Sequence, residues 1–262
     1  MAHKLYIGTN TKMYKGISET CAYLSALGEL TADIDRNECE IFVIPSFTTL
    51  ESAYRQAQKA QVRLGGQNMG WEAAGQYTGE ISPLMLREVG VEIVQIGHSE
   101  RRQVFYEDDE MENRKVLCAL QHGFTALLCI GETEKQKNFS LSGEVLRTQL
   151  KVGLQGVEPQ DICRLWIAYE PVWAIGVNGK PAGKEYASQM HLLIRKTLEE
   201  LFGRQAAKQI PILYGGSVNR QNADDLICMP DIDGLFIGRS AWDAEPFSEI
   251  IHHVLPHFQK CK

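Results

Sequence analysis

Polar side chains recur directly after short apolar runs of this sequence. Asn10 and Lys12 follow the first run, His98 follows a later one, and Glu170 ends another. A carboxylate in apolar surroundings has its charged form destabilised, which makes it a better base near neutral pH. A helix-start pattern begins at Ser99, so the helix macrodipole disfavours an imidazolium at His98. A neutral imidazole can donate a hydrogen bond to a developing enediolate oxygen.

Three further features suit an anionic substrate. Lys12 supplies fixed positive charge for an oxyanion and a phosphate. The glycine-rich turns at Gly215-Gly216 and Gly238 can offer backbone N–H groups to a phosphate. Taken singly, a lysine near a strand end is usually a solvated charge, and a single histidine is more often structural. Their joint placement fits proton abstraction next to a carbonyl on a phosphorylated substrate.

Eight short apolar or β-branched runs are typical of buried parallel strands, and helical patterns lie between them. The runs are Leu5–Gly8, Ile41–Pro45, Val62–Gln67, Ile93–Gly97, Ala126–Ile130, Leu165–Tyr169, Ile210–Tyr214 and Leu235–Gly238. The clearest helical patterns are Thr48–Lys59, Met111–Gln121, Leu141–Val152, Ala187–Leu201 and Pro246–Val254. The strand ends lie roughly 33 residues apart on average, the size of a β-α-β step.

This repeat predicts a single-domain (β/α)8 barrel of the α/β class over residues 1–262, and no linker divides the chain. In such a barrel the carboxyl ends of all eight strands meet at one mouth, which would gather the polar residues named above. An open doubly wound sheet is the alternative, but its first strand should open onto G-x-G-x-x-G. The segment Gly8-Thr9-Asn10-Thr11-Lys12 does not have that pattern.

Composition excludes several classes of protein. The chain has 262 residues, of which 44% are hydrophobic and 23% charged, as in ordinary globular proteins. The formal net charge of -6 argues against a nucleic-acid partner and means that an anionic substrate must be captured locally. No apolar run approaches the roughly 20 residues of a membrane span, and no signal-peptide pattern precedes Lys4. We expect a soluble cytoplasmic protein with no membrane partner.

The seven cysteines are odd in number and scattered, and no C-x-x-C pair occurs among them. This pattern predicts reduced thiols, not a disulfide framework or a zinc site. The cysteines are Cys21, Cys39, Cys118, Cys129, Cys163, Cys228 and Cys261.

Several motifs resemble those of the triosephosphate isomerase family, in the same order and spacing along essentially the full chain. They are Asn10-x-Lys12-Met13, Ile96-Gly97-His98-Ser99-Glu100-Arg101-Arg102, Cys129-Ile130-Gly131-Glu132, Tyr169-Glu170-Pro171-Val172-Trp173-Ala174-Ile175-Gly176 and Tyr214-Gly215-Gly216-Ser217-Val218. The resemblance implies an aldose-ketose isomerase that uses no cofactor and no metal. The pairing of a glutamate base with a neutral histidine is this family's own mechanism, so it is inherited from the resemblance.

The family's site residues carry over one by one. Glu170 would be the base, His98 the electrophile and Lys12 the electrostatic clamp, with Asn10 beside it on the substrate. Glu100 would be a buried partner that orients the cations of the site. Phosphate contacts would come from Gly176, Ser217, Gly238 and the backbone N–H of Arg239.

Two segments acquire roles from the same resemblance. Residues Pro171 to Ala182 would form a mobile lid that closes over the intermediate and excludes water. Residues Met69 to Glu80 would reach into a neighbouring subunit. A homodimer is therefore expected, with Thr78 near the partner's Lys12.

The sequence departs from the family pattern at several positions near the substrate. Thr11 and Tyr14 replace the usual Trp and Asn, and Arg239 stands where a second glycine is usual. The lid is about one residue longer than usual and contains Asn178-Gly179, while Trp71 marks an unusual interface loop. Interconversion of glyceraldehyde 3-phosphate and dihydroxyacetone phosphate, a step of glycolysis and gluconeogenesis, is the default expectation. The alternative is a four-carbon tetrulose phosphate of erythritol catabolism, because relatives with that activity share the lid, Trp71 and Arg239 features.

Three other classes of function remain as alternatives. A barrel that only binds phosphate or a protein would more readily have lost one member of the acid-base set. A Schiff-base aldolase needs a desolvated lysine at a strand end, and Lys12 beside Asn10 lacks that desolvation. A metal enzyme is not expected, because Asp108-Asp109-Glu110 has the pattern of a solvated helix start. The histidines His252-His253 and His257 are expected on the surface of the last helix.

Overall fold

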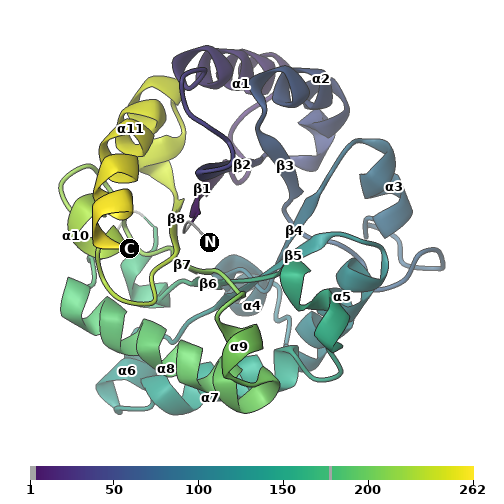
Figure 1. Ribbon diagram of the computed structural model, residues 1–262. Helices are drawn as coiled ribbons and strands as arrows, with labels where there is room; N and C mark the ends of the chain where they lie inside the picture. Colours follow the sequence, from purple (N-terminus) through teal and green to yellow (C-terminus); the bar gives the residue numbers. More distant parts are fainter. Residues whose placement is uncertain (1–3, 177–178) are drawn as a thin grey trace.

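The computed structural model describes residues 4–176 and 179–262 (Figure 1). Eight parallel strands pair in chain order, and β8 pairs with β1, so the sheet closes into a barrel. The predicted (β/α)8 barrel is therefore confirmed. The strands are β1 Leu5–Asn10, β2 Cys39–Ile44, β3 Arg63–Gly66, β4 Ile93–Ile96, β5 Thr125–Ile130, β6 Leu165–Tyr169, β7 Ile212–Tyr214 and β8 Gly234–Ile237.

Helices surround the barrel as an outer ring (Figure 1). They are α1 Ile17–Leu30, α2 Leu50–Ala60, α3 Pro83–Glu88, α4 Ser99–Val104, α5 Asp109–Gln121, α6 Glu134–Asn138, α7 Ser142–Gly153, α8 Lys184–Phe202, α9 Arg204–Ala207, α10 Ala223–Ile227 and α11 Ala244–Cys261. Four short 3-10 turns join them, namely η1 Phe47–Thr49, η2 Pro159–Arg164, η3 Val172–Ala174 and η4 Arg239–Ala241. Within the described residues, no helix is long and apolar enough to cross a membrane.

The strands are apolar on both faces because each face is covered. One apolar cluster fills the barrel interior, and a larger one lies between the strands and the helices. In the interior, the ring of Phe42 packs 5.6 Å from the rings of both Trp166 and Phe236. A Cβ at Gly8 would lie 2.5 Å from the Phe42 ring, so this glycine leaves the room that the aromatic layer needs. The near-continuous apolar runs of the sequence follow from this double burial.

The end of the last helix differs from the sequence-based expectation. The apolar pattern predicts a helix that ends near Val254, but α11 continues through Pro256 to Cys261. The final turn thereby reaches the C-terminal end of α10, where Cys228 and Cys261 form a disulfide with 5.4 Å between their Cα atoms. The prediction that all seven cysteines are free thiols is wrong for this pair, because residues 33 apart in sequence meet only through tertiary packing.

Candidate active site

His98 lies at the junction between β4 and α4, as the N-cap residue of the helix. Its Nδ1 accepts a hydrogen bond from the backbone N–H of Glu100 at 3.3 Å. An accepting Nδ1 carries no proton, so this contact assigns the single proton of a neutral ring to Nε2. Nε2 lies 3.8 Å from Oε1 of Glu170. The ring is buried, and its N–H points toward the carboxylate at the mouth of the barrel.

Glu170 follows β6 directly, and its side chain is only 6% exposed. Its Oε2 is shielded from water and has no hydrogen-bond partner in the part of the chain that the structure describes. A buried carboxylate oxygen without a donor is costly to maintain, so this atom stands ready for a partner that a substrate can supply. The thiol of Cys129 is a neutral neighbour, because burial, and then the charge of Glu170, raise the pKa of that cysteine well above its usual range.

Gly215 makes room for the glutamate. It directly follows β7, and its backbone N–H donates to the carbonyl of Tyr169 at 2.8 Å. A Cβ at this position would lie 2.8 Å from Cγ and 3.2 Å from Oε1 of Glu170. The glycine-rich turn that the sequence analysis assigned to phosphate therefore has a second, steric role beside the carboxylate.

Lys12 is held in a left-handed backbone conformation, with φ of 52°. Such a conformation is costly for a non-glycine residue and persists only where its surroundings impose it. The backbone N–H of Lys12 donates to Oδ1 of Asn10 at 2.6 Å. Its carbonyl accepts from Nε2 of Gln67 at 2.7 Å and from the hydroxyl of Ser46 at 2.8 Å. These three hydrogen bonds fix the backbone from which the lysine side chain extends.

Gln95 and Glu100 hold the side chains of Asn10 and Lys12, respectively. The amide of Asn10 donates to Oε1 of Gln95 at 2.6 Å, a buried contact that the sequence analysis missed. The ammonium of Lys12 donates to Oε1 of Glu100 at 2.7 Å, and the other oxygen of that carboxylate lies 3.5 Å from Nδ1 of His98. Glu100 thus pairs with the cationic Lys12 and lies beside the His98 ring. It is not buried, however, because its side chain is 49% exposed in the single chain.

The residues expected to hold a phosphate converge on the lid. Gly176 has φ of 85°, and Ser217, with φ of 45°, donates its hydroxyl to the carbonyl of Ala174. Arg239 donates from Nη2 to the carbonyl of Gly176 at 3.1 Å. Arg239 begins the 3-10 turn η4 after Gly238, so this non-glycine residue takes a helical backbone that needs no positive φ. The phosphate contacts themselves stay predictions.

Glu132 contacts the lid through Trp173, a role that was not predicted from the sequence. It follows β5 and is fully buried. Its carboxylate accepts hydrogen bonds from the hydroxyls of Tyr169 and Tyr186 and from Nε1 of Trp173. Burial raises the pKa of Tyr186 to about 12, so this hydroxyl remains a donor. The signal was available, since a carboxylate directly after a buried strand repeats the arrangement of Glu170.

The two segments expected to form the lid and the interface loop differ in how fully they are described. Residues 177 and 178 of the lid, including Asn178 of the expected insertion, lie outside the described residues. The interface loop is described, and Thr78 is exposed near its tip. The loop pairs with itself through the N–H of Gly70 and the carbonyl of Ile81 at 2.8 Å, and the guanidinium of Arg114 lies 4.2 Å from the ring of Trp71. The expected contact of Thr78 with a second subunit stays a prediction.

Comparisons with known proteins agree with this geometry. The family model described as triosephosphate isomerase matches residues 5–254. The chain is 46% identical to a Rhizobium etli protein named L-erythrulose-1-phosphate isomerase, over 95% of this chain and 92% of that protein. It is 42% identical to a Rhizobium meliloti protein of the same name, over 95% and 96% of the two chains. It is 43% identical to the triosephosphate isomerase of Caldanaerobacter subterraneus subsp. tengcongensis, over 94% and 98% of the two chains.

Substitution of Glu132 by leucine tests the support of the lid. Glu132→Leu leaves buried N–H and O–H donors without an acceptor and should lower the free energy of unfolding by about 2–4 kcal/mol. Glu132→Gln keeps one acceptor oxygen and should cost less. Urea denaturation measures both, with Glu134→Leu on the exposed first turn of α6 as the control. Equal stability of Glu132→Leu and the control would contradict the assigned role.

Proposed function

The chain belongs to the triosephosphate isomerase family and is a phosphosugar isomerase, and we propose that Glu170 moves the proton between adjacent carbons of its substrate. One observation carries this proposal. Glu170 has a shielded oxygen without a partner among the described residues, and its other oxygen faces Nε2 of His98 at 3.8 Å. A base and a neutral hydrogen-bond donor thus share one buried site. Proton transfer next to a carbonyl requires this combination.

The proposed steps follow from the positions of the side chains. Glu170 removes a proton from the carbon beside the carbonyl, and the carbonyl oxygen becomes an enediolate oxygen. His98 donates its Nε2–H to that oxygen, and the ammonium of Lys12 stabilises the negative charge. His98 gives its Nε2 proton to the enediolate oxygen and takes the hydroxyl proton from the first carbon, which becomes the new carbonyl. Glu170 then returns its proton to the neighbouring carbon, and both side chains regain their starting protonation. The lid over residues 171–182 excludes water while the enediolate exists, and Glu132 holds the base of the lid.

We propose a four-carbon ketose phosphate, L-erythrulose 1-phosphate, as the substrate. This sugar is dihydroxyacetone phosphate with an added hydroxymethyl group on the carbon that loses its proton. The same acid-base set can therefore serve both sugar phosphates. The residues around the reacting carbon have to make room for the added hydroxymethyl group. Two of the compared relatives are named for this substrate. Arg239 departs from the glycine that is usual in the family, and it binds at Gly176 the lid that would close over either sugar.

Triose phosphate is the second candidate. The Caldanaerobacter relative is named for it and has nearly the same identity to this chain. The acid-base set does not separate the two substrates, because they differ only in the group attached to the reacting carbon. The distinction therefore depends on the lid and on its contact with Arg239.

A homodimer belongs to the same proposal. The loop over residues 69–80 presents Tyr77 with 44% of its surface exposed, beside Thr78 at the loop tip. An exposed aromatic on a loop that closes on itself suits insertion into a second copy of the chain. That arrangement would bring Thr78 near the partner's Lys12.

Side-by-side kinetics separate the two substrates. We expect kcat/KM for L-erythrulose 1-phosphate to exceed that for dihydroxyacetone phosphate by about tenfold or more, the range that one pocket-filling group supplies. Arg239→Gly should reduce this ratio, while Arg220→Gly, which removes an exposed arginine paired with Glu249, should leave it unchanged. A higher kcat/KM for the triose phosphate would overturn the proposed substrate and leave the isomerase assignment intact.

Removal of the base tests the role of Glu170. Glu170→Gln keeps the shape of the side chain but cannot accept the proton, so kcat should fall by about three orders of magnitude. Binding of glycerol 3-phosphate, measured by calorimetry, should stay within a few-fold of the wild type, because its phosphate does not contact the base. Glu29→Gln, on the exposed face of α1, is the control. Retained turnover in Glu170→Gln would contradict the assignment.

A further inference from the structure

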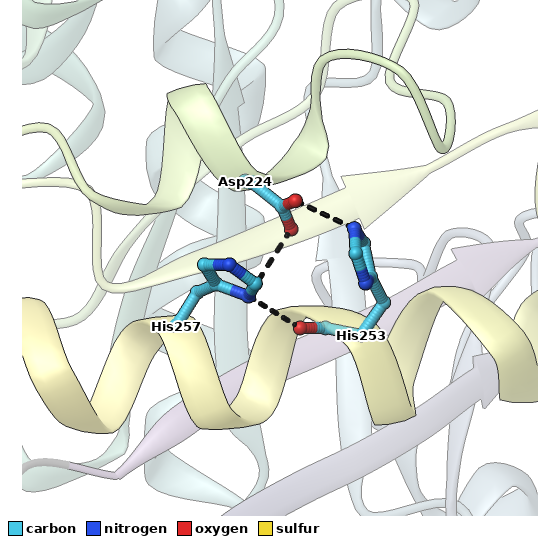
Figure 2. A group of neighbouring side chains, drawn as sticks. All are labelled: Asp224, His253 and His257. Atoms are coloured by element: carbon cyan, nitrogen blue, oxygen red, sulfur yellow. Dashed lines mark hydrogen bonds and ion pairs between the residues drawn. The ribbon is translucent and has the colours of Figure 1, made fainter.

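The helices α10 and α11 bring three metal-binding side chains together outside the barrel mouth (Figure 2). Asp224 comes from α10, and His253 and His257 lie one turn apart on α11. One ligand atom from each side chain lies within 4.8 Å of the others. The sequence-based expectation placed the histidines on the surface without a metal. That expectation did not include Asp224, which lies next to His253 and His257 only in the folded chain.

We propose that Asp224, His253 and His257 form a binding site for a divalent transition-metal ion, with zinc as the representative. Imidazole nitrogen and carboxylate oxygen are ligands that Zn²⁺ takes in proteins. Three protein ligands leave a fourth tetrahedral position for water. The same donor set also suits Co²⁺, Ni²⁺ and Cu²⁺.

The distances within the cluster suit an ion after small side-chain rotations. Nε2 of His253 lies 2.6 Å from Oδ2 of Asp224, and Nδ1 of His257 lies 3.7 Å from Oδ1 of the same carboxylate. Ligand atoms of a tetrahedral zinc lie about 3.3 Å apart, since each bond is about 2.0 Å long. The distance from His253 to Asp224 therefore has to lengthen, and the distance from His257 to Asp224 has to shorten. The His253 side chain is 41% exposed and free to make that adjustment.

The environment of one oxygen of Asp224 indicates a cation site and not a simple ion pair. Oδ1 is shielded from solvent, yet it has no hydrogen-bond partner in residues 4–176 and 179–262. The contact with His253 uses the other oxygen. Nδ1 of His257 makes its hydrogen bond to the carbonyl of His253 at 2.8 Å, so it does not satisfy Oδ1. This nitrogen would give up that hydrogen bond and its proton on binding the ion. An ion held between the three side chains would supply the missing partner.

The position of the site implies a structural effect. An ion would tie α11 to α10, and α10 follows the turn that carries Ser217. Asn222, at the start of α10, donates to the carbonyl of Ser217 at 3.1 Å. The Cys228–Cys261 disulfide joins the same two helices, with each cysteine four residues beyond Asp224 or His257. The metal would therefore strengthen a junction that the chain already links covalently.

Calorimetric titration with Zn²⁺ tests the proposal on the full chain. Wild type should bind one ion, and His253→Gln and Asp224→Asn should each bind it about tenfold or more weakly. His252→Gln is the matched control, because His252 lies on the same helix but contacts Asp33 at 3.1 Å. Zinc should also raise the Tm of wild type and of the control, but not that of Asp224→Asn.

Cobalt provides a readout that does not depend on stability. Co²⁺ should give visible absorption of a four-coordinate ion with wild type and with His252→Gln, and this absorption should be lost in His253→Gln. Isomerase activity of each variant verifies that it is folded. Zinc binding of equal strength in wild type and Asp224→Asn, or no one-to-one binding in wild type, would overturn the site.

Discussion

The site depends on one constraint: the fold has to keep a carboxylate buried beside an imidazole N–H and leave one carboxylate oxygen without a hydrogen-bond donor. Glu170 meets this requirement at the end of β6, with Oε2 unpartnered among the described residues and Oε1 3.8 Å from His98. A buried charge with so few donors is unfavourable, so neighbouring structure must hold it in place. The closed barrel does so, because it brings the ends of β4, β6 and β7 to one mouth. Gly215 then leaves the space that the side chain occupies.

A second buried carboxylate shows what the same side chain does in a different environment. Glu132, on the neighbouring strand end, accepts hydrogen bonds from Tyr169, Trp173 and Tyr186. Its oxygens are satisfied by neutral donors, one of which, Trp173, belongs to the lid. The contrast with Glu170 lies in the number of donors and not in burial, since both side chains are shielded from water. The proposed function gives Glu132 a structural role and Glu170 the reactive one.

The parts of the molecule that sequence could predict are those with a local or repeated pattern. The eight strands were predictable because burial on both faces leaves continuous apolar runs, and the location of His98 and Glu170 at strand ends followed with them. The exposed state of Glu100 depends on how far its short helix projects, which no pattern records. The Cys228–Cys261 disulfide and the approach of His257 to Asp224 required that helix to continue through Pro256. A proline there ends the apolar pattern without ending the helix.

Proton transfer by Glu170 through an enediolate is tested most directly by running the isomerisation in D2O and following the product by proton NMR. A proton held on a carboxyl group exchanges with solvent in a fraction of the turnovers even under a closing lid, whereas a hydride carried directly between two carbons never does. The product should therefore carry deuterium at the carbon that receives the proton, well above the level of uncatalysed exchange. Product that contains only carbon-bound protium, as a direct hydride shift between the two carbons would give, would contradict the role assigned to Glu170.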